Sequence, residues 1–290
     1  PLCRDQLMHS SKRSTLAGIF FLGLSIILFE IALTRVFAIM MWHHFTYMVI
    51  SIGLLGFGAS GSLLTATRWA ERSTAPAKAL TVVSAAYGVS VMLAFCFATL
   101  VRIDSLAIWQ QKENFVALFF VYLIVFVPFL LGGMGIGMAL TRFAKDVNRL
   151  YFGDLVGSAL GAGLSVVLMK QFGSSAAVMC AGGFGLLAAF CFGMGAPRRY
   201  LVLTVPGLLL AAVVVIAFAG GGLGIPAADW RVPYAPGKEA QILEREIEQM
   251  TARGVPGLGI DKIYSATAEV QVGPELPSTP GIGGDKGLLD

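Results

Sequence analysis

Residues 15–39 read TLAGIFFLGLSIILFEIALTRVFAI, and the only charged side chains in this run are Glu30 and Arg35. A helix needs about 20 apolar residues to cross the hydrocarbon core of a bilayer, so the run is long enough for one crossing. Backbone amides and carbonyls inside lipid find hydrogen-bond partners only within the protein. The run is therefore expected to be a transmembrane helix.

Further apolar runs follow along the chain, at residues 44–67, 79–101, 115–141, 152–171, 174–195 and 200–220. Hydrophobic residues make up 56% of the chain and charged residues 13%, compared with roughly 25% charged residues in soluble domains. No water-soluble fold of 290 residues buries so much apolar surface. The sequence predicts an all-α integral membrane protein, a polytopic bundle of about seven helices over residues 15–220, after an N-terminal tail at residues 1–14.

Basic residues concentrate in alternate loops, namely Arg4, Lys12, Arg13, Arg68, Arg72, Lys78, Arg142, Lys145, Arg149, Arg198 and Arg199. The positive-inside rule predicts that these loops and the N-terminus are cytoplasmic. Because the basic residues form no single patch, nucleic acid is not an expected partner; the lipid bilayer is. Only a few residues separate the fifth run from the sixth, so a re-entrant segment remains an alternative, and with it the side on which the C-terminal part lies.

Residues 221–290 differ in kind from the rest. Pro233, Pro236 and Gly237 indicate a linker, residues 238–253 have the pattern of an amphipathic helix, and residues 264–272 alternate apolar and polar side chains as a strand does. One helix and one strand make no core. We expect this segment to begin a soluble α+β domain whose remainder is missing from the chain.

Ionisable groups inside a membrane are costly and are candidates for function. Glu30 and Arg35 are five residues apart, whereas side chains three or four apart face one another on a helix, so Glu30 faces Thr34. The functional interpretation is an ion or substrate site near Glu30. The structural alternative is a hydrogen bond between helices, with Arg35 reaching the interface.

Asp154 and Tyr151 lie at the predicted start of the fifth helix. A carboxylate in a first turn complements the helix dipole, which is the alternative to a site. His43 and His44 follow Trp42 at an expected membrane interface, with no third ligand beside them. The four cysteines form no cluster either, so the sequence predicts no metal site.

Glycines spaced four or five apart suggest close helix packing, at Gly56, Gly61, Gly153, Gly157 and Gly161. Such faces let a second helix approach to backbone contact. They also allow a homo-oligomer.

Four motifs resemble the membrane domain of bacterial spermidine-synthase-like fusion proteins: LFEIALTR at 28–35, WHHF at 42–45, GLLGFGASG at 53–61 and YFGDLVGSALG at 151–161. The resemblance covers roughly residues 15–195. It implies a bacterial inner membrane location and a downstream soluble domain similar to polyamine aminopropyltransferases, with decarboxylated S-adenosylmethionine or S-adenosylmethionine as its cofactor. It gives no cofactor and no catalytic residues for this chain.

The resemblance implies a membrane domain that anchors or feeds a soluble transferase, with no activity in this part alone. Glu30, Arg35 and Asp154 support a second hypothesis, a transporter for polyamines or other small cations. The glycine faces support a third, a non-catalytic membrane scaffold.

Overall fold

The structure is a computed structural model, and it describes residues 2–40, 46–68, 75–101, 112–195, 261–264 and 269–272. The chain divides into two compact units, Pro1–Pro236 and Gly237–Asp290. The change in composition predicts a division at residue 221, and that division stays a prediction.

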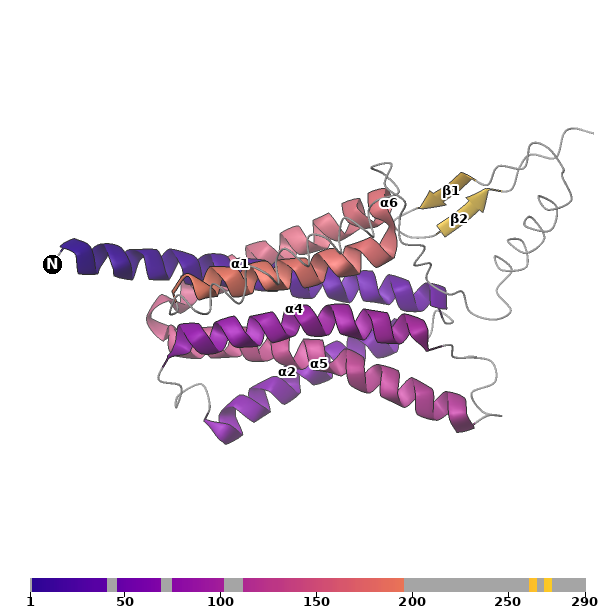
Figure 1. The fold of residues 1–290 in the computed structure, drawn as a ribbon, viewed down its shortest axis with the longest axis horizontal. Helices are drawn as coiled ribbons and strands as arrows, with labels where there is room; N and C mark the ends of the chain where they lie inside the picture. The colour runs from indigo at the N-terminus through magenta and orange to yellow at the C-terminus, as the bar shows by residue number, and fades with distance from the viewer. Residues whose placement is uncertain are drawn as a thin grey trace, which may run out of the picture. The chain divides into compact units, whose positions relative to one another are not determined.

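The first unit is a bundle of long helices (Figure 1). Its elements are α1 (Leu2–Met40), α2 (Thr46–Thr67), α4 (Pro76–Leu100), α5 (Lys112–Arg142), the short 3-10 helix η2 (Ala144–Asp146) and α6 (Val147–Gly193). Five of these helices are long and apolar enough to cross a membrane. This confirms the predicted class of integral membrane helical protein.

Residues 2–14 of the predicted N-terminal tail are helical, because α1 already begins at Leu2, whereas the part of α1 that could cross a membrane begins at Arg13. Residues 2–14 contain neither Pro nor Gly, so nothing in the sequence stops the helix when its composition turns polar. Length and hydropathy mark the apolar part of a helix, not its end.

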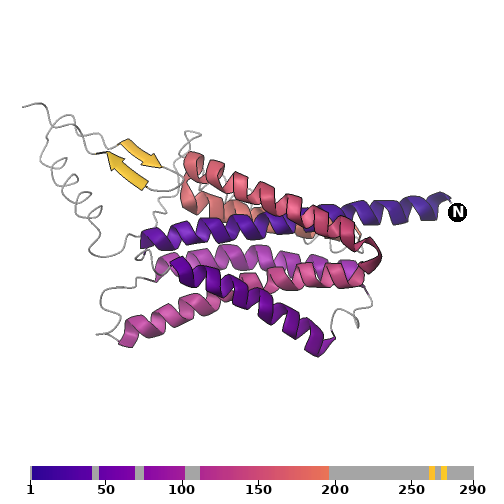
Figure 2. The ribbon, with the colours of Figure 1, turned by 180° about the vertical axis from the view of Figure 1, so that it is seen from behind.

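α6 contains the fifth and sixth predicted runs. As one straight rod its 47 residues would extend about 70 Å, more than twice the thickness of a bilayer core. Gly173 breaks it with non-helical angles (φ 84°, ψ 169°). Figures 1 and 2 show two arms that double back on one another. We call residues 147–172 the first arm and residues 174–193 the second arm.

The predicted count of seven spans is not supported. The described residues contain five helices of sufficient length, one of which is the α6 hairpin with two arms. The seventh predicted run, at residues 200–220, lies outside the described residues.

α1 is the most enclosed of the single helices. It packs along α6 over most of its apolar length and also contacts α2 and α5, while α4 joins α6 to α5 and α2 lies against α5. The core at these contacts is aliphatic and aromatic, with Phe29 of α1 tilted against Phe129 of α5 at a ring-centroid distance of 5.2 Å.

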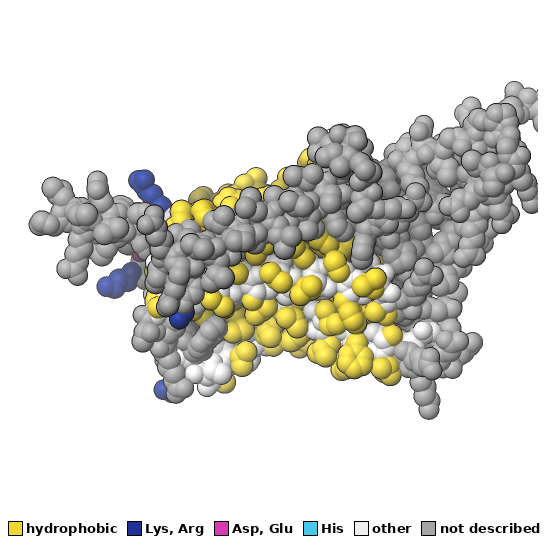
Figure 3. Space-filling view, in the orientation of Figure 1, with side chains coloured by type: hydrophobic (Ala, Val, Ile, Leu, Met, Phe, Trp, Pro, Cys, Tyr) yellow, Lys and Arg dark blue, Asp and Glu magenta, His cyan; other side chains and the backbone are white. Residues whose placement is uncertain are grey.

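The outward faces of the helices are also apolar. Large hydrophobic side chains are exposed along α2, α4, α5 and the first arm, among them Leu54, Leu93, Phe119 and Leu160. Figure 3 shows this apolar surface between the ends of the bundle. Water would penalise such a continuous surface, whereas lipid accommodates it, so the packing agrees with a membrane location.

The described part of the second unit is a two-stranded antiparallel hairpin, β1 (Asp261–Tyr264) and β2 (Glu269–Val272), in which Asp261 is opposite Val272. The single strand predicted over residues 264–272 is therefore wrong. The alternating pattern continues through the reversal, and no Gly or Pro between 264 and 269 indicates a turn. The predicted amphipathic helix at 238–253 lies outside the described residues.

Candidate functional site

α1 and the first arm of α6 meet backbone to backbone along a row of small residues. A Cβ atom on Gly157 would overlap the carbonyl oxygen of Phe20, and one on Gly161 would overlap that of Leu24 and lie 3.0 Å from its Cα. Gly153 continues the row against Leu16. We call these three glycines the glycine seam; it allows the close approach that small residues four apart provide in membrane helices.

Asp154 lies beside the glycine seam and faces α1. A Cβ on Gly23 would overlap the Oδ1 atom of Asp154 and would lie 3.1 Å from the Oγ of Ser158, so the absence of a side chain at Gly23 makes room for the carboxylate. Oδ1 is buried and has no hydrogen-bond partner within the described part of the chain. A buried acceptor without a donor costs roughly 1–3 kcal/mol, and more when it is charged.

The placement of Asp154 in a first helical turn is wrong. α6 begins at Val147, and its first turn holds no acidic residue, so Asp154 lies about two turns inside the helix. The partial charge of a helix end acts only within the first turn. The dipole therefore does not explain this carboxylate.

Glu30 lies further along the same face of α1. It follows Gly23 by seven residues, which is close to two full turns and about 10 Å along the axis. Its Oε1 atom would be 3.7 Å from a Cβ on Gly53 of α2, beside the ring of Phe129 of α5. The side chain is half-buried. Two carboxylates thus lie on one side of α1, one toward α6 and the other toward α2.

The two polar neighbours of Glu30 on α1 lie in different surroundings. The Thr34 hydroxyl donates to the carbonyl oxygen of Ile31 at 2.7 Å, so it serves its own helix rather than Glu30. Arg35 is half-buried near the end of the helix. Tyr151 is 54% exposed and lies on the outward surface.

The remaining predicted residues fall in different surroundings. Gly56 packs on α5, where a Cβ would be 2.6 Å from the Cβ of Phe129. Gly61 has open space around it and is exposed, so the predicted packing contact is not met among the described residues. His43 and His44 lie outside the described residues. In the ranges that are described, no three His, Cys, Asp or Glu side chains gather as a metal site would require.

Sequence reasoning missed a buried polar cluster on the opposite side of α1. The Ser25 hydroxyl donates to the carbonyl oxygen of Ala181 at 2.5 Å and lies 2.9 Å from the Tyr87 hydroxyl, which joins α1, α4 and the second arm of α6. Ser14 similarly donates to Cys191 O at 2.6 Å. Ser14 and Ser25 are eleven residues apart, which is about three turns of helix, so the two hydroxyls lie on one face of α1. This spacing is visible in the sequence, but serine carries no charge and is therefore not among the ionisable candidates.

The chain was compared with protein-family models, curated proteins and solved structures, and none matches it.

Proposed function

We propose that this chain is the membrane domain of a spermidine-synthase-like protein and that it binds a cationic solute, such as a polyamine, within the bilayer. The observation that carries the proposal is the buried Oδ1 of Asp154, which has no hydrogen-bond partner among the described residues. The solute would be delivered to a soluble S-adenosyl-nucleotide-dependent transferase domain. This part of the protein has no activity by itself.

A cation accounts for the two carboxylates better than packing alone does. Acidic side chains inside a membrane persist where they face a partner, a cavity or a transport path. Asp154 faces α1 at Gly23, and Glu30 lies about 10 Å along the same face. A flexible solute with more than one amino group is the class of ligand that two intramembrane carboxylates favour.

The distribution of charge supports an orientation. α1, α4 and α6 begin at the end of the bundle where α2 and α5 finish (Figures 1 and 2). Figure 3 shows Lys and Arg side chains at this end. By the positive-inside rule the N-terminus is cytoplasmic, in the inner membrane of a bacterium. Seven spans, completed by residues 200–220 and followed by a soluble α+β segment, remain part of this proposal.

A transporter without an enzyme domain is the second candidate, and the same Asp154 carboxylate favours it. The two differ in the downstream domain: a transferase fusion binds an S-adenosyl nucleotide as a full-length protein, and a transporter does not. A scaffold, the third hypothesis, needs only the glycine seam, so it predicts no effect of Glu30→Gln on any ligand.

Binding of spermidine to the detergent-purified chain, measured by isothermal titration calorimetry, tests the proposal. We expect Asp154→Asn to weaken binding about tenfold or more, since a hydrogen bond to a charged group is worth roughly 1.5–3 kcal/mol. Glu30→Gln should weaken it as well. Asp146→Asn, which removes an acid at the end of the bundle, should not. Unaltered affinity in the Asp154→Asn, Glu30→Gln double variant would reject the cation site and leave the scaffold.

A further inference from the structure

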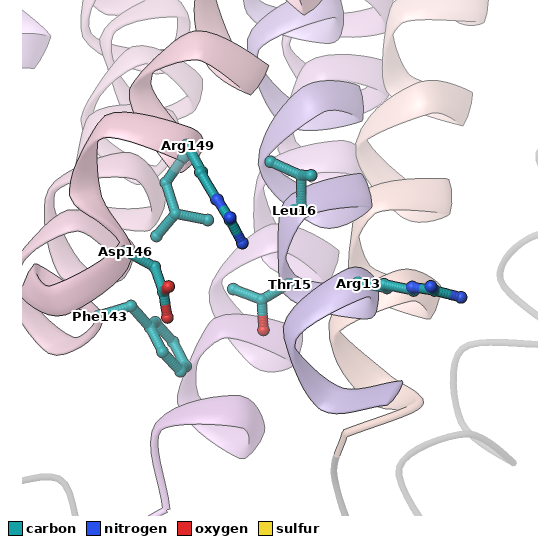
Figure 4. A pocket seen from close by; sticks show the side chains of 7 residues that line it. Arg13, Thr15, Leu16, Phe143, Asp146 and Arg149 are labelled. Atoms are coloured by element: carbon teal, nitrogen blue, oxygen red, sulfur yellow. The ribbon is translucent and has the colours of Figure 1, made fainter. Parts of the chain in front are cut away.

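A cavity of about 240 Å³ lies at the basic end of the bundle, between the start of the apolar part of α1 and the turn from α5 into α6. Its lining is Arg13, Thr15, Leu16, Phe143, Asp146, Arg149 and Leu150. Figure 4 shows Arg149 reaching from α6 toward α1, where Thr15 and Leu16 lie, while Arg13 points away along the rim. The cavity is distinct from the carboxylate pair, because Asp154 and Glu30 do not line it.

The lining is complementary to a single negative charge. The lining includes two arginines and one aspartate, a formal charge of +1, and Arg149 is the arginine that extends into the space between α6 and α1 (Figure 4). A guanidinium carries five donors in a planar fork that matches the oxygens of a phosphate, so Arg149 can bind an anion and still donate to a carboxylate beside it. The Asp146 carboxylate would oppose a second negative charge. The cavity thus favours a monoanion, such as a phosphodiester, over a dianionic phosphate.

The apolar side of the lining indicates that the ligand has an apolar part as well. Leu16, Phe143 and Leu150 share the cavity with the charged groups. The helices around it continue into the apolar outer surface of the bundle (Figure 3). A ligand with a monoanionic head and an acyl chain satisfies both parts of this surface.

We propose that this cavity binds the head group of an anionic phospholipid from the leaflet at the basic end, with the Arg149 guanidinium on the phosphate and the acyl chains along the outer face of the helices. Basic pockets between transmembrane helices bind anionic lipid head groups in this way. The proposal is independent of the cation site and of the direction in which the chain is inserted.

Retention of phosphatidylglycerol by the detergent-purified whole chain, measured by native mass spectrometry with phosphatidylcholine as the neutral reference, tests this inference. We expect phosphatidylglycerol to be preferred, and Arg149→Gln to weaken its binding about tenfold, as expected for a lost bond to a charged group. Lys170→Gln is the matched control, because Lys170 is an exposed cation near the other end of the first arm. It should leave the preference unchanged.

A second variant keeps the test independent of the stability of Arg149→Gln. Asp146→Asn raises the charge of the lining to +2, so phosphatidylglycerol should bind more tightly. Equal retention of the two lipids, or equal losses in Arg149→Gln and Lys170→Gln, would overturn the proposal. Inorganic phosphate, tested alone at the same concentration, distinguishes a lipid head group from a soluble phosphate compound as the ligand. If phosphate displaces the lipid from the wild-type chain but not from Arg149→Gln, the cavity binds a soluble phosphate compound instead.

Discussion

The hydroxyl oxygens of Ser25 and Tyr87 lie 2.9 Å apart, and both side chains are completely buried between α1, α4 and the second arm of α6. Ser25 has one proton and donates it to the Ala181 carbonyl. Tyr87 must therefore donate to Ser25. The order of donation runs from Tyr87 through Ser25 to the backbone of α6, so the two hydroxyls are not equivalent.

This order predicts unequal costs for removing the two hydroxyls. Ser25→Ala leaves the buried Tyr87 hydroxyl without its acceptor and should destabilise the chain by about 1–2 kcal/mol, whereas Tyr87→Phe leaves the Ser25–Ala181 bond intact and should cost about 0.6 kcal/mol. Unfolding of both variants in mixed detergent micelles measures the difference. A larger loss for Tyr87→Phe would contradict the assigned order.

The glycine seam predicts that an alanine substitution destabilises the protein at Gly157, which contacts α1, but not at Gly163, which does not. A Cβ on Gly157 would overlap the backbone of Phe20, which cannot move aside as a side chain can. Gly157→Ala should therefore cost about 1–3 kcal/mol as overpacking does. Gly163, on the same arm, has nothing within 4 Å of its Cβ position. Gly163→Ala should be neutral or stabilise by roughly 0.5–1 kcal/mol, through helix propensity alone. Similar unfolding midpoints for both variants would refute the close contact.

The backbone angles of Gly173 predict that any side chain at this position destabilises the turn, although there is space for it. Its Cβ position is also open, so the cost of a side chain there comes only from the backbone angles (φ 84°, ψ 169°). This region is essentially restricted to glycine, and a side chain there costs of order 1–3 kcal/mol. It is not the left-handed helical well that asparagine tolerates, so Gly173→Asn should destabilise as much as Gly173→Ala. Limited proteolysis at the turn between the arms, together with thermal unfolding, would detect the loss; a full rescue by asparagine would show that the turn has other angles.

The position of Gly23 beside Asp154 predicts that a substitution at Gly23 weakens cation binding although both carboxylates remain. A methyl group at this position would take the space of the Asp154 Oδ1 atom and force the carboxylate away from α1. We expect Gly23→Ala to lower the affinity for spermidine several-fold while the helix content stays the same. Gly58→Ala on α2, where nothing lies within 4 Å, is the control for adding a methyl group. Equal affinities in calorimetry would show that Asp154 does not bind the solute at this place.

The sequence predicted those parts of the fold that depend on a single helix. The predicted runs at 44–67, 79–101 and 115–141 match α2, α4 and α5 to within three residues at each end, because the length of an apolar run follows from the thickness of the bilayer. Gly153, Gly157 and Gly161 stood out because their spacing is periodic on one helix, and the structure places all three against α1.

The sequence could not predict the contacts between residues on different helices or strands. Glu30 and Asp154 are both visible in the sequence, but nothing in it says that Gly23 opens space for one and Gly53 lies beside the other. The Ser25–Tyr87 pair joins residues 62 positions apart, and each is an ordinary residue on its own helix. The reversal between β1 and β2 is hidden because alternation by itself carries no information on chain direction.

The packing of α1 against α6 also has a consequence for biosynthesis. Phe20 and Gly157, which meet in the glycine seam, are 137 positions apart in the sequence. Synthesis proceeds at about 5–20 residues per second. On the order of ten seconds therefore pass between the synthesis of α1 and the synthesis of α6, whose carbonyl oxygens accept hydrogen bonds from the serines of α1. During that interval Ser14 and Ser25 have lipid, an insertion factor or another helix as neighbours instead of the carbonyls of Cys191 and Ala181. The α6 hairpin is thus the last of the described helices to be made, and a ribosome that stalls before it leaves α1 without its main packing partner.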